Sequence, residues 1–238
     1  EGLTVTTYEA LLEALRMGGA SADVPTLIML GSDITIPAGG DRTNPPINGS
    51  GYFKIDGGGH TLVRENESYY FLGNINADDD AVHIELTNIQ LAQGANSFLS
   101  MIYVCNGRIT LGKGVALNGQ HMIAAVGEKA ALELGDGCEL SYETGSSPCC
   151  VRVMNGAILV LNGGKTAAGT YIRLSNDIFP AVSYPLISVP KALTGDVHLC
   201  FTLNGISAIA QGADGYQLTQ ADYDRLTVNP ESSWVSLY

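Results

Sequence analysis

The chain has 238 residues, of which 45% are hydrophobic and only 15% are charged, so it holds ample material for a packed core. Its formal net charge is −12, from 24 acidic and 12 basic side chains, and such a surface repels nucleic-acid phosphates and anionic membranes. No run of 18 apolar residues occurs. We therefore expect no nucleic-acid partner and no membrane insertion.

The N-terminal segment predicts a short amphipathic helix. Thr6 is expected as its N-cap with Glu9 as the capping-box partner, and Gly18 and Gly19 end it. Such a helix suits the open end of a repeat structure, where unpaired strand edges and the core need a cover. The sequence starts at Glu1 without a recognisable signal peptide, which we interpret as a processed or trimmed chain.

Short runs with alternating apolar residues follow the helix, separated by loops rich in Gly, Asn and Pro. Alternation with a period of two is typical of strands that have one buried side. The predicted strands are Thr26–Leu30, Asp33–Ile36, Phe53–Asp56, His60–Val63, Tyr69–Leu72, Val82–Leu86 and Ile89–Leu91.

Three stretches in the middle of the chain align with one another almost without gaps: Ser100–Leu117, Met122–Leu140 and Cys149–Lys165. Each has two alternating runs joined by a polar or Gly corner, and a repeat of this kind buries its apolar side only by stacking on its neighbours. The inward positions of the three repeats are predicted to stack in columns. They are Ile102, Val104, Ile109 and Leu111, then Ala124, Val126, Leu132 and Leu134, then Val151, Val153, Leu159 and Leu161.

The sequence thus predicts an all-β fold, a single-stranded parallel β-solenoid of about seven coils in one domain, 1–238. Residues 1–25 form the cap-helix region, 26–210 the coils and 211–238 a closing segment. That segment holds a small helix from Gln220 to about Leu226 with Thr219 as N-cap, and a last strand, Trp234–Leu237.

The N-terminal arrangement resembles a known family. The cap helix, the stretch Leu27–Ile36 (LIMLGSDITI) and the stretch Phe53–Leu62 (FKIDGGGHTL) are similar to the entry of right-handed parallel β-helices in the pectate-lyase-like superfamily. The resemblance covers essentially the whole chain and is strongest to non-catalytic β-helix domains of bacterial surface and secreted proteins. It implies a right-handed coil and an extracellular or cell-surface location, whereas relatives range from polysaccharide lyases to adhesins.

Catalysis in that superfamily implies carboxylates at outward positions of successive coils. The aligned repeats offer two outward rows, Tyr103–Ala125–Arg152 and Thr110–Glu133–Val160. Neither row repeats a carboxylate or pairs it with a base, so no catalytic residue is predicted.

Two segments are candidates for ligand binding. Asp78, Asp79 and Asp80 precede a strand and offer oxygen ligands for calcium, but no further ligand follows at a characteristic spacing, so a solvated turn is the favoured interpretation. Tyr69 and Tyr70 lie in the densest aromatic stretch, and outward rings there would stack on sugars, but alternation places one or two of the three rings Tyr69–Phe71 in the core, so packing is the favoured interpretation. No other cofactor is expected. Asp56 and His60 are interpreted as corner residues, and Cys138, Cys149 and Cys150 as ordinary thiols.

Three functions remain open. The first is a non-catalytic secreted or cell-surface module that is adhesin-like or recognises a polysaccharide or a host surface protein. The second is a polysaccharide lyase or glycoside hydrolase whose carboxylates come from loops, with Asp41, Asp56, Asp78–Asp80 and Asp136 as candidates. The third is a structural stalk that spaces other domains.

Overall fold

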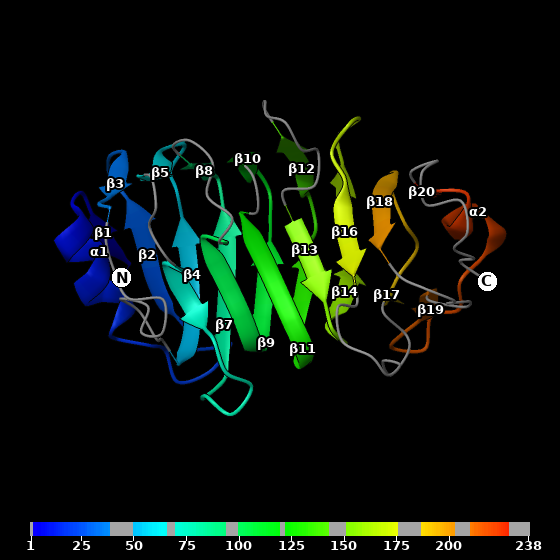
Figure 1. Ribbon diagram of the computed structural model, residues 1–238, viewed down its shortest axis with the longest axis horizontal. Coiled ribbons are helices and arrows are strands. Elements are labelled where there is room, and N and C mark those ends of the chain that lie inside the picture. The colour runs from blue at the N-terminus through cyan, green and yellow to red at the C-terminus, as the bar shows by residue number, and fades with distance from the viewer. Residues whose placement is uncertain are drawn as a thin grey trace.

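A computed structural model of the chain describes residues 2–38, 50–65, 70–93, 100–119, 122–142, 151–175, 187–202 and 210–228. It shows an all-β parallel β-solenoid of about seven turns with one short helix near each end, which confirms the predicted fold class. The turns are stacked side by side, with α1 (Tyr8–Leu15) at one end and α2 (Gln220–Tyr223) at the other (Figure 1).

The strands lie on three sides of the solenoid, which we call the first, second and third faces. The first face contains β1 (Leu3–Val5), β2 (Thr26–Leu30), β4 (Gly51–Asp56), β7 (Val82–Thr87), the second halves of β9 (Ile102–Leu111) and β11 (Ile123–Leu134), β14 (Ile158–Leu161), β17 (Ile187–Val189) and β19 (Ala210–Gly212). The second face contains β3 (Ile34–Ile36), β5 (Thr61–Arg64), β8 (Gln90–Gln93), β10 (Ala116–Asn118), β12 (Glu139–Tyr142) and β15 (Lys165–Thr166). The third face contains β6 (Leu72–Asn74), the first halves of β9 and β11, β13 (Val151–Met154), β16 (Ile172–Ser175), β18 (Val197–Thr202) and β20 (Leu226–Val228).

The two longest strands, β9 and β11, run from the third face to the first without a break. Gly107 lies at the corner of β9 with φ +122°, and a Cβ there would come within 1.9 Å of the Val82 carbonyl oxygen. Only glycine combines this backbone angle with such a close approach of two chains. The corner therefore depends on Gly107.

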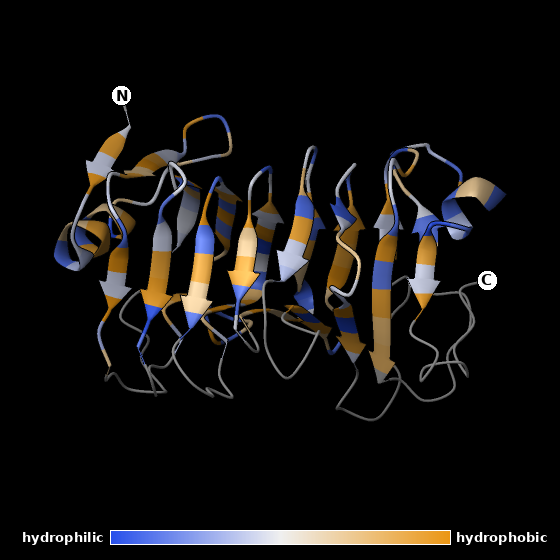
Figure 2. Ribbon diagram, turned by 90° about the horizontal axis from the view of Figure 1, so that it is seen from above, coloured by the Kyte–Doolittle hydropathy of each residue, from blue (hydrophilic) through white to orange (hydrophobic). Residues whose placement is uncertain are grey.

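Inward side chains of equivalent strands stack in columns, as the sequence predicts. One column on the first face places Ile55, Leu86, Leu111, Leu134 and Leu161 at paired positions of successive turns, and each is at most 4% exposed. Hydrophobic and hydrophilic bands alternate along the strands (Figure 2). Burying one such side chain stabilises the fold by roughly 1.5–3 kcal/mol, so the columns hold the turns together.

One part of the predicted register is wrong. The inward residues of β11 on the third face are Ile123 and Ala125, which pair with Ile102 and Val104, whereas Val126 is only half-buried. The register shifts by two residues between Ala125 and Lys129, and this bulge was not apparent in the repeat alignment.

The same shift changes the outward row of the third face. Ala124, not the predicted Ala125, stands between Tyr103 and Arg152. The other predicted row is confirmed, because Thr110, Glu133 and Val160 occupy paired positions on the first face.

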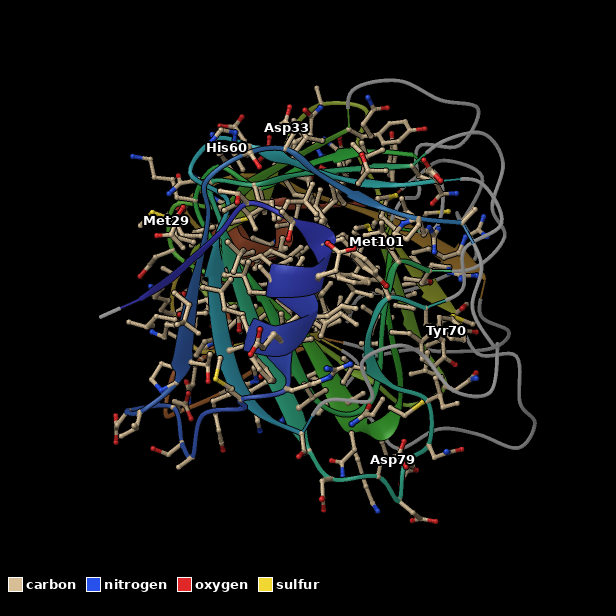
Figure 3. The ribbon with its side chains drawn as sticks, turned by 90° about the vertical axis from the view of Figure 1, so that its left-hand side faces the viewer. Met29, Asp33, His60, Tyr70, Asp79 and Met101 are labelled. Carbon is tan, nitrogen blue, oxygen red and sulfur yellow. The ribbon has the colours of Figure 1, made fainter. Side chains whose placement is uncertain are left out.

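The two ends of the solenoid are closed differently. At the N-terminal end α1 packs Leu11 and Leu15 onto the core, and Thr7 rather than Thr6 is its N-cap, with the Thr7 hydroxyl accepting from the Ala10 amide at 3.2 Å. α1 lies across the open end of the solenoid in Figure 3.

At the C-terminal end Thr219 caps α2 as predicted, but the helix ends at Tyr223 and Leu226 begins β20. The buried Asp222 accepts hydrogen bonds from the Tyr216 hydroxyl at 2.6 Å and the Leu193 amide at 2.9 Å. The predicted strand Trp234–Leu237 lies outside the described residues.

Candidate functional site

An open groove of about 350 Å³ lies on the first face. Outward side chains of β4, β7, β9 and β11 form its floor, and the link between α1 and β2 forms a wall. The main lining residues are Ala22, Pro25, Tyr52, Lys54, His83, Glu85, Arg108, Thr110 and Glu133. Because a concave site with a few converging polar groups is the usual place for a ligand, we treat this groove as the candidate site.

The strand register produces two outward rows in the groove. Tyr52, His83 and Arg108 occupy paired positions in one row. In the other row Lys54 pairs with Glu85, Glu85 with Thr110, and Thr110 with Glu133. Side chains alternate between the two sides of a strand, so these residues point outward because their neighbours fill the core columns.

The rings of Tyr52 and His83 stack on each other. Their centroids are 4.3 Å apart and their planes differ by 2°. Burial is the main cause that lowers the pKa of His83 below its ordinary value, and the positive charge of Arg108 lowers it further. The imidazole is therefore neutral near pH 7, and the pair forms a fixed, uncharged part of the groove.

The charged groups of the groove are joined in ion pairs between turns. Lys54 Nζ lies 3.1 Å from Glu85 Oε2, and Arg108 Nη1 donates to Glu133 Oε2 at 2.8 Å. The second carboxylate oxygen of Glu133 accepts from Asn162 Nδ2 at 2.8 Å, and Glu133 is only 7% exposed. A carboxylate held by two donors in this way has a fixed orientation and positions both of its partners.

The three predicted aspartates lie on one turn after β6. Asp78 is fully exposed and lies 3.5 Å from Lys129 Nζ, and Asp79 Oδ2 accepts from the Asn76 amide at 3.0 Å. Asp80 contributes its backbone carbonyl, which accepts from Asn74 Nδ2 at 3.0 Å. The hydrogen bonds hold the turn itself, and a calcium ion bound to it stays a prediction.

The buried Asn74 organises this corner. Its Oδ1 accepts from the amides of Cys105 at 2.8 Å and Asn106 at 3.0 Å, so it fastens β6 to β9. Among the residues that the structure describes, no group of three or more His, Cys, Asp or Glu side chains is placed to hold a metal ion.

Of the two predicted tyrosines, Tyr70 is described and Tyr69 is not. The ring centroid of Tyr70 lies 4.4 Å from that of Tyr103, with the planes inclined by 42°. Figure 3 places Tyr70 on the side opposite Met29 of the first face, so it is not part of the groove. Tyr70 instead belongs to the third face.

The remaining loop acids are dispersed. Asp56 Oδ1 accepts from the Gly58 amide at 2.8 Å, which is the role of a corner residue, and Asp136 lies 2.6 Å from Lys191 Nζ. His60 Nδ1 lies 3.4 Å from Asp33 at another corner (Figure 3). Asp41 is outside the described residues.

The described cysteines are free thiols. Cys105 and Cys138 are buried, Cys200 is partly buried, and burial raises the pKa of Cys138 to about 12. Cys149 and Cys150 lie outside the described part of the chain.

The sequence did not predict the groove residues on β4 and β7, because these strands lie outside the three repeats that align with one another. A direct comparison of GYFKID (51–56) with VHIELT (82–87) would have placed Tyr52 beside His83 and Lys54 beside Glu85. With those turns added, the row that holds Glu133 gains a second carboxylate and a lysine.

Comparison of the chain with protein-family models, with curated proteins and with solved structures gives no match. The fold therefore stands on the structure itself, and function has to be argued from the chemistry of the surface. Of the helices within the described ranges, none has the length and apolar character needed to cross a membrane.

Proposed function

We propose that this chain is a non-catalytic recognition module that binds a glycan in the groove of the first face. The observation that carries the proposal is the pairing of charges, since Lys54–Glu85 and Arg108–Glu133 are ion pairs within the groove. In such ion pairs the cations can still donate hydrogen bonds to sugar hydroxyls, and the carboxylates can still accept them. They lack the free acid and base that hydrolysis or elimination needs.

The shape of the groove supports a saccharide. Its rows repeat at the strand spacing of about 4.8 Å, so an extended polymer would meet similar groups along the solenoid axis. Its volume of about 350 Å³ suits a few sugar rings, whereas a stable protein partner typically covers about 800 Å² of surface. We favour an uncharged saccharide, because the groove pairs each cation with a carboxylate.

The resemblance to β-helix domains of bacterial surface and secreted proteins supports a location outside the cell or on its surface. A host surface protein is the alternative partner. Free sugars would compete with a bound glycan but not with a host protein, so a competition assay distinguishes the two partners.

The test is a screen on a glycan array followed by titration calorimetry with the best neutral oligosaccharide. Tyr52→Ala removes one ring of the stack and should weaken binding about tenfold or more, whereas Tyr171→Ala, on the third face, should leave affinity unchanged. Equal affinities of the parent chain and Tyr52→Ala, or binding to no neutral glycan on the array, would refute the groove as the site.

One observation favours a hydrolase as a second candidate. Glu85 and Glu133 stand in the same outward row with Thr110 between them, which is two strand spacings or roughly 10 Å. Inverting glycosidases hold their two carboxyl groups roughly 6.5–9.5 Å apart. New reducing ends in neutral polysaccharides, produced by the parent chain and lost in Glu85→Gln, would establish this candidate and overturn the non-catalytic one.

A further inference from the structure

The third face has an unusual composition for so acidic a chain. The sequence contains 24 acidic residues, yet the described strands of this face hold no Asp or Glu. The strand segments concerned are Leu72–Asn74, 102–104, 123–126, Val151–Met154, Ile172–Ser175, Val197–Thr202 and Leu226–Val228.

Two arginines lie side by side on this face. Arg152 on β13 and Arg173 on β16 are paired positions of adjacent parallel strands, so their Cα atoms are about 4.8 Å apart. Both point outward, because Val153 and Leu174, the residues that follow them, fill the core. Like charges at directly opposed positions destabilise a sheet, so fold stability does not account for this pair.

Arg152 lies against a pair of tyrosines. Its Nη2 donates to Ser100 Oγ at 3.1 Å, and Ala124, the residue paired with Arg152 on β11, is fully buried. Arg152 thereby lies beside Tyr103, the ring of which is 4.4 Å from that of Tyr70. Burial raises the pKa of Tyr103, so its hydroxyl keeps its proton and remains a donor.

The side chain of Arg173 forms no hydrogen bond or ion pair with any described residue, and its Nε is buried. A guanidinium has five N–H donors, and burying even part of it without an acceptor carries a large energetic penalty. An arginine that is half-buried, next to a second arginine and without an acceptor among the described residues is therefore suited to bind an oxyanion.

We propose that Arg152, Arg173 and the Tyr70–Tyr103 pair form a second binding site, which takes the acidic group of a saccharide. The group is an oxyanion on a sugar ring, either the carboxylate of a uronic acid or a sulfate ester. The two guanidinium forks bind the oxyanion, and the tyrosine rings contact the sugar that bears it. This site is independent of the groove on the first face.

The charge of the chain favours a saccharide over a nucleic acid. Nucleic-acid binding rests on many phosphate contacts, each made by Lys or Arg, and the described strands of this face carry only Arg152 and Arg173. An acidic sugar places one charge at a time on the pair.

The test uses titration calorimetry of the whole chain with polygalacturonate, dextran sulfate and neutral dextran at low salt. We expect one of the two acidic polymers to bind, which identifies the oxyanion, and dextran not to bind. Arg173→Gln should weaken that binding about tenfold or more, because a hydrogen bond to a charged group contributes about 1.5–3 kcal/mol. Lys113→Gln, which removes the same charge at an exposed corner, should change affinity less than about twofold.

Arg173→Lys serves as a second variant. It keeps the charge but loses the fork, so intermediate affinity is expected, and circular dichroism establishes that each variant is folded. The proposal is overturned if neither acidic polymer binds, if Arg173→Gln binds as tightly as the parent chain, or if Lys113→Gln loses as much. Tighter binding of duplex DNA than of both acidic polymers would also overturn it.

Discussion

The first and third faces share one core but differ in their outer chemistry. On the first face acids and bases alternate between turns, as in Lys54–Glu85 and Arg108–Glu133. On the third face the described strands carry no acid, and Arg152 stands beside Arg173. The inward columns fix the register, so the outward residues are free to vary, and function follows from the outer rows.

The contrast also separates stability from binding. Charges that neutralise each other across strands contribute to holding the turns, whereas adjacent like charges oppose it. Removing a charge should therefore have opposite consequences on the two faces.

Leu134→Ala should have the largest effect, because it opens a cavity in a column that supports the sheet. The expected loss is about 2–5 kcal/mol in the free energy of unfolding, measured by urea denaturation. Thr110→Ala, an outward change on the neighbouring strand, should alter it by less than about 1 kcal/mol. Similar losses in the two variants would contradict the inward and outward assignment.

Glu133→Ala should rank next, because it deprives Arg108 and Asn162 of a buried acceptor. We expect a loss of about 1–3 kcal/mol in the same measurement. Glu85→Ala breaks an exposed pair and should lose at most about 1 kcal/mol. Equal effects would show that burial does not distinguish the two ion pairs.

Asp222 should make the closing segment sensitive to acid. Burial opposes its charged form, but hydrogen bonds from the Tyr216 hydroxyl, the Leu193 amide and Thr219 outweigh this and lower the pKa of its carboxyl to about 2 from 3.8. The stability that it contributes is complete above the ordinary value and is lost as pH falls from about 4 through about 2.

Asp222→Asn should therefore be less stable at pH 7, by about 1–2 kcal/mol, and should lose less stability than the parent chain between pH 4 and pH 2. Thermal unfolding followed by circular dichroism at several pH values measures both. Parallel pH profiles of the two chains would contradict the role assigned to this carboxylate.

Arg173→Gln should have the smallest effect on stability, in contrast to Glu133→Ala. Since Arg173 has no described partner, we expect a change within about 0.5 kcal/mol in urea denaturation, or a slight gain. A loss above about 1 kcal/mol would mean that Arg173 stabilises the fold, and the third face would then resemble the first.

The fold was predictable because the Gly corners and alternating runs recur in successive repeats, and stacking is the arrangement that buries them all. The register on the third face was not, since a bulge after Ala125 absorbs two residues that an alignment almost without gaps does not count. The prediction therefore placed Val126 in the core, and it put Ala125 instead of Ala124 between Tyr103 and Arg152.

The candidate site was harder to predict than the fold. Phe53 and Ile84 are paired in space, but the loop between their strands differs in length from those of the central repeats, so Tyr52 and His83 did not align. The sequence does show three successive aspartates at Asp78–Asp80. It does not show that two of them are engaged with Lys129 and the Asn76 amide.

The most direct test is a crossed binding measurement with one neutral and one acidic oligosaccharide. Tyr52→Ala should lose affinity for the neutral ligand and keep it for the acidic one, whereas Arg173→Gln should do the reverse, each by about tenfold. If both variants lose both ligands equally, or neither variant changes either affinity, the two faces do not recognise separate ligands.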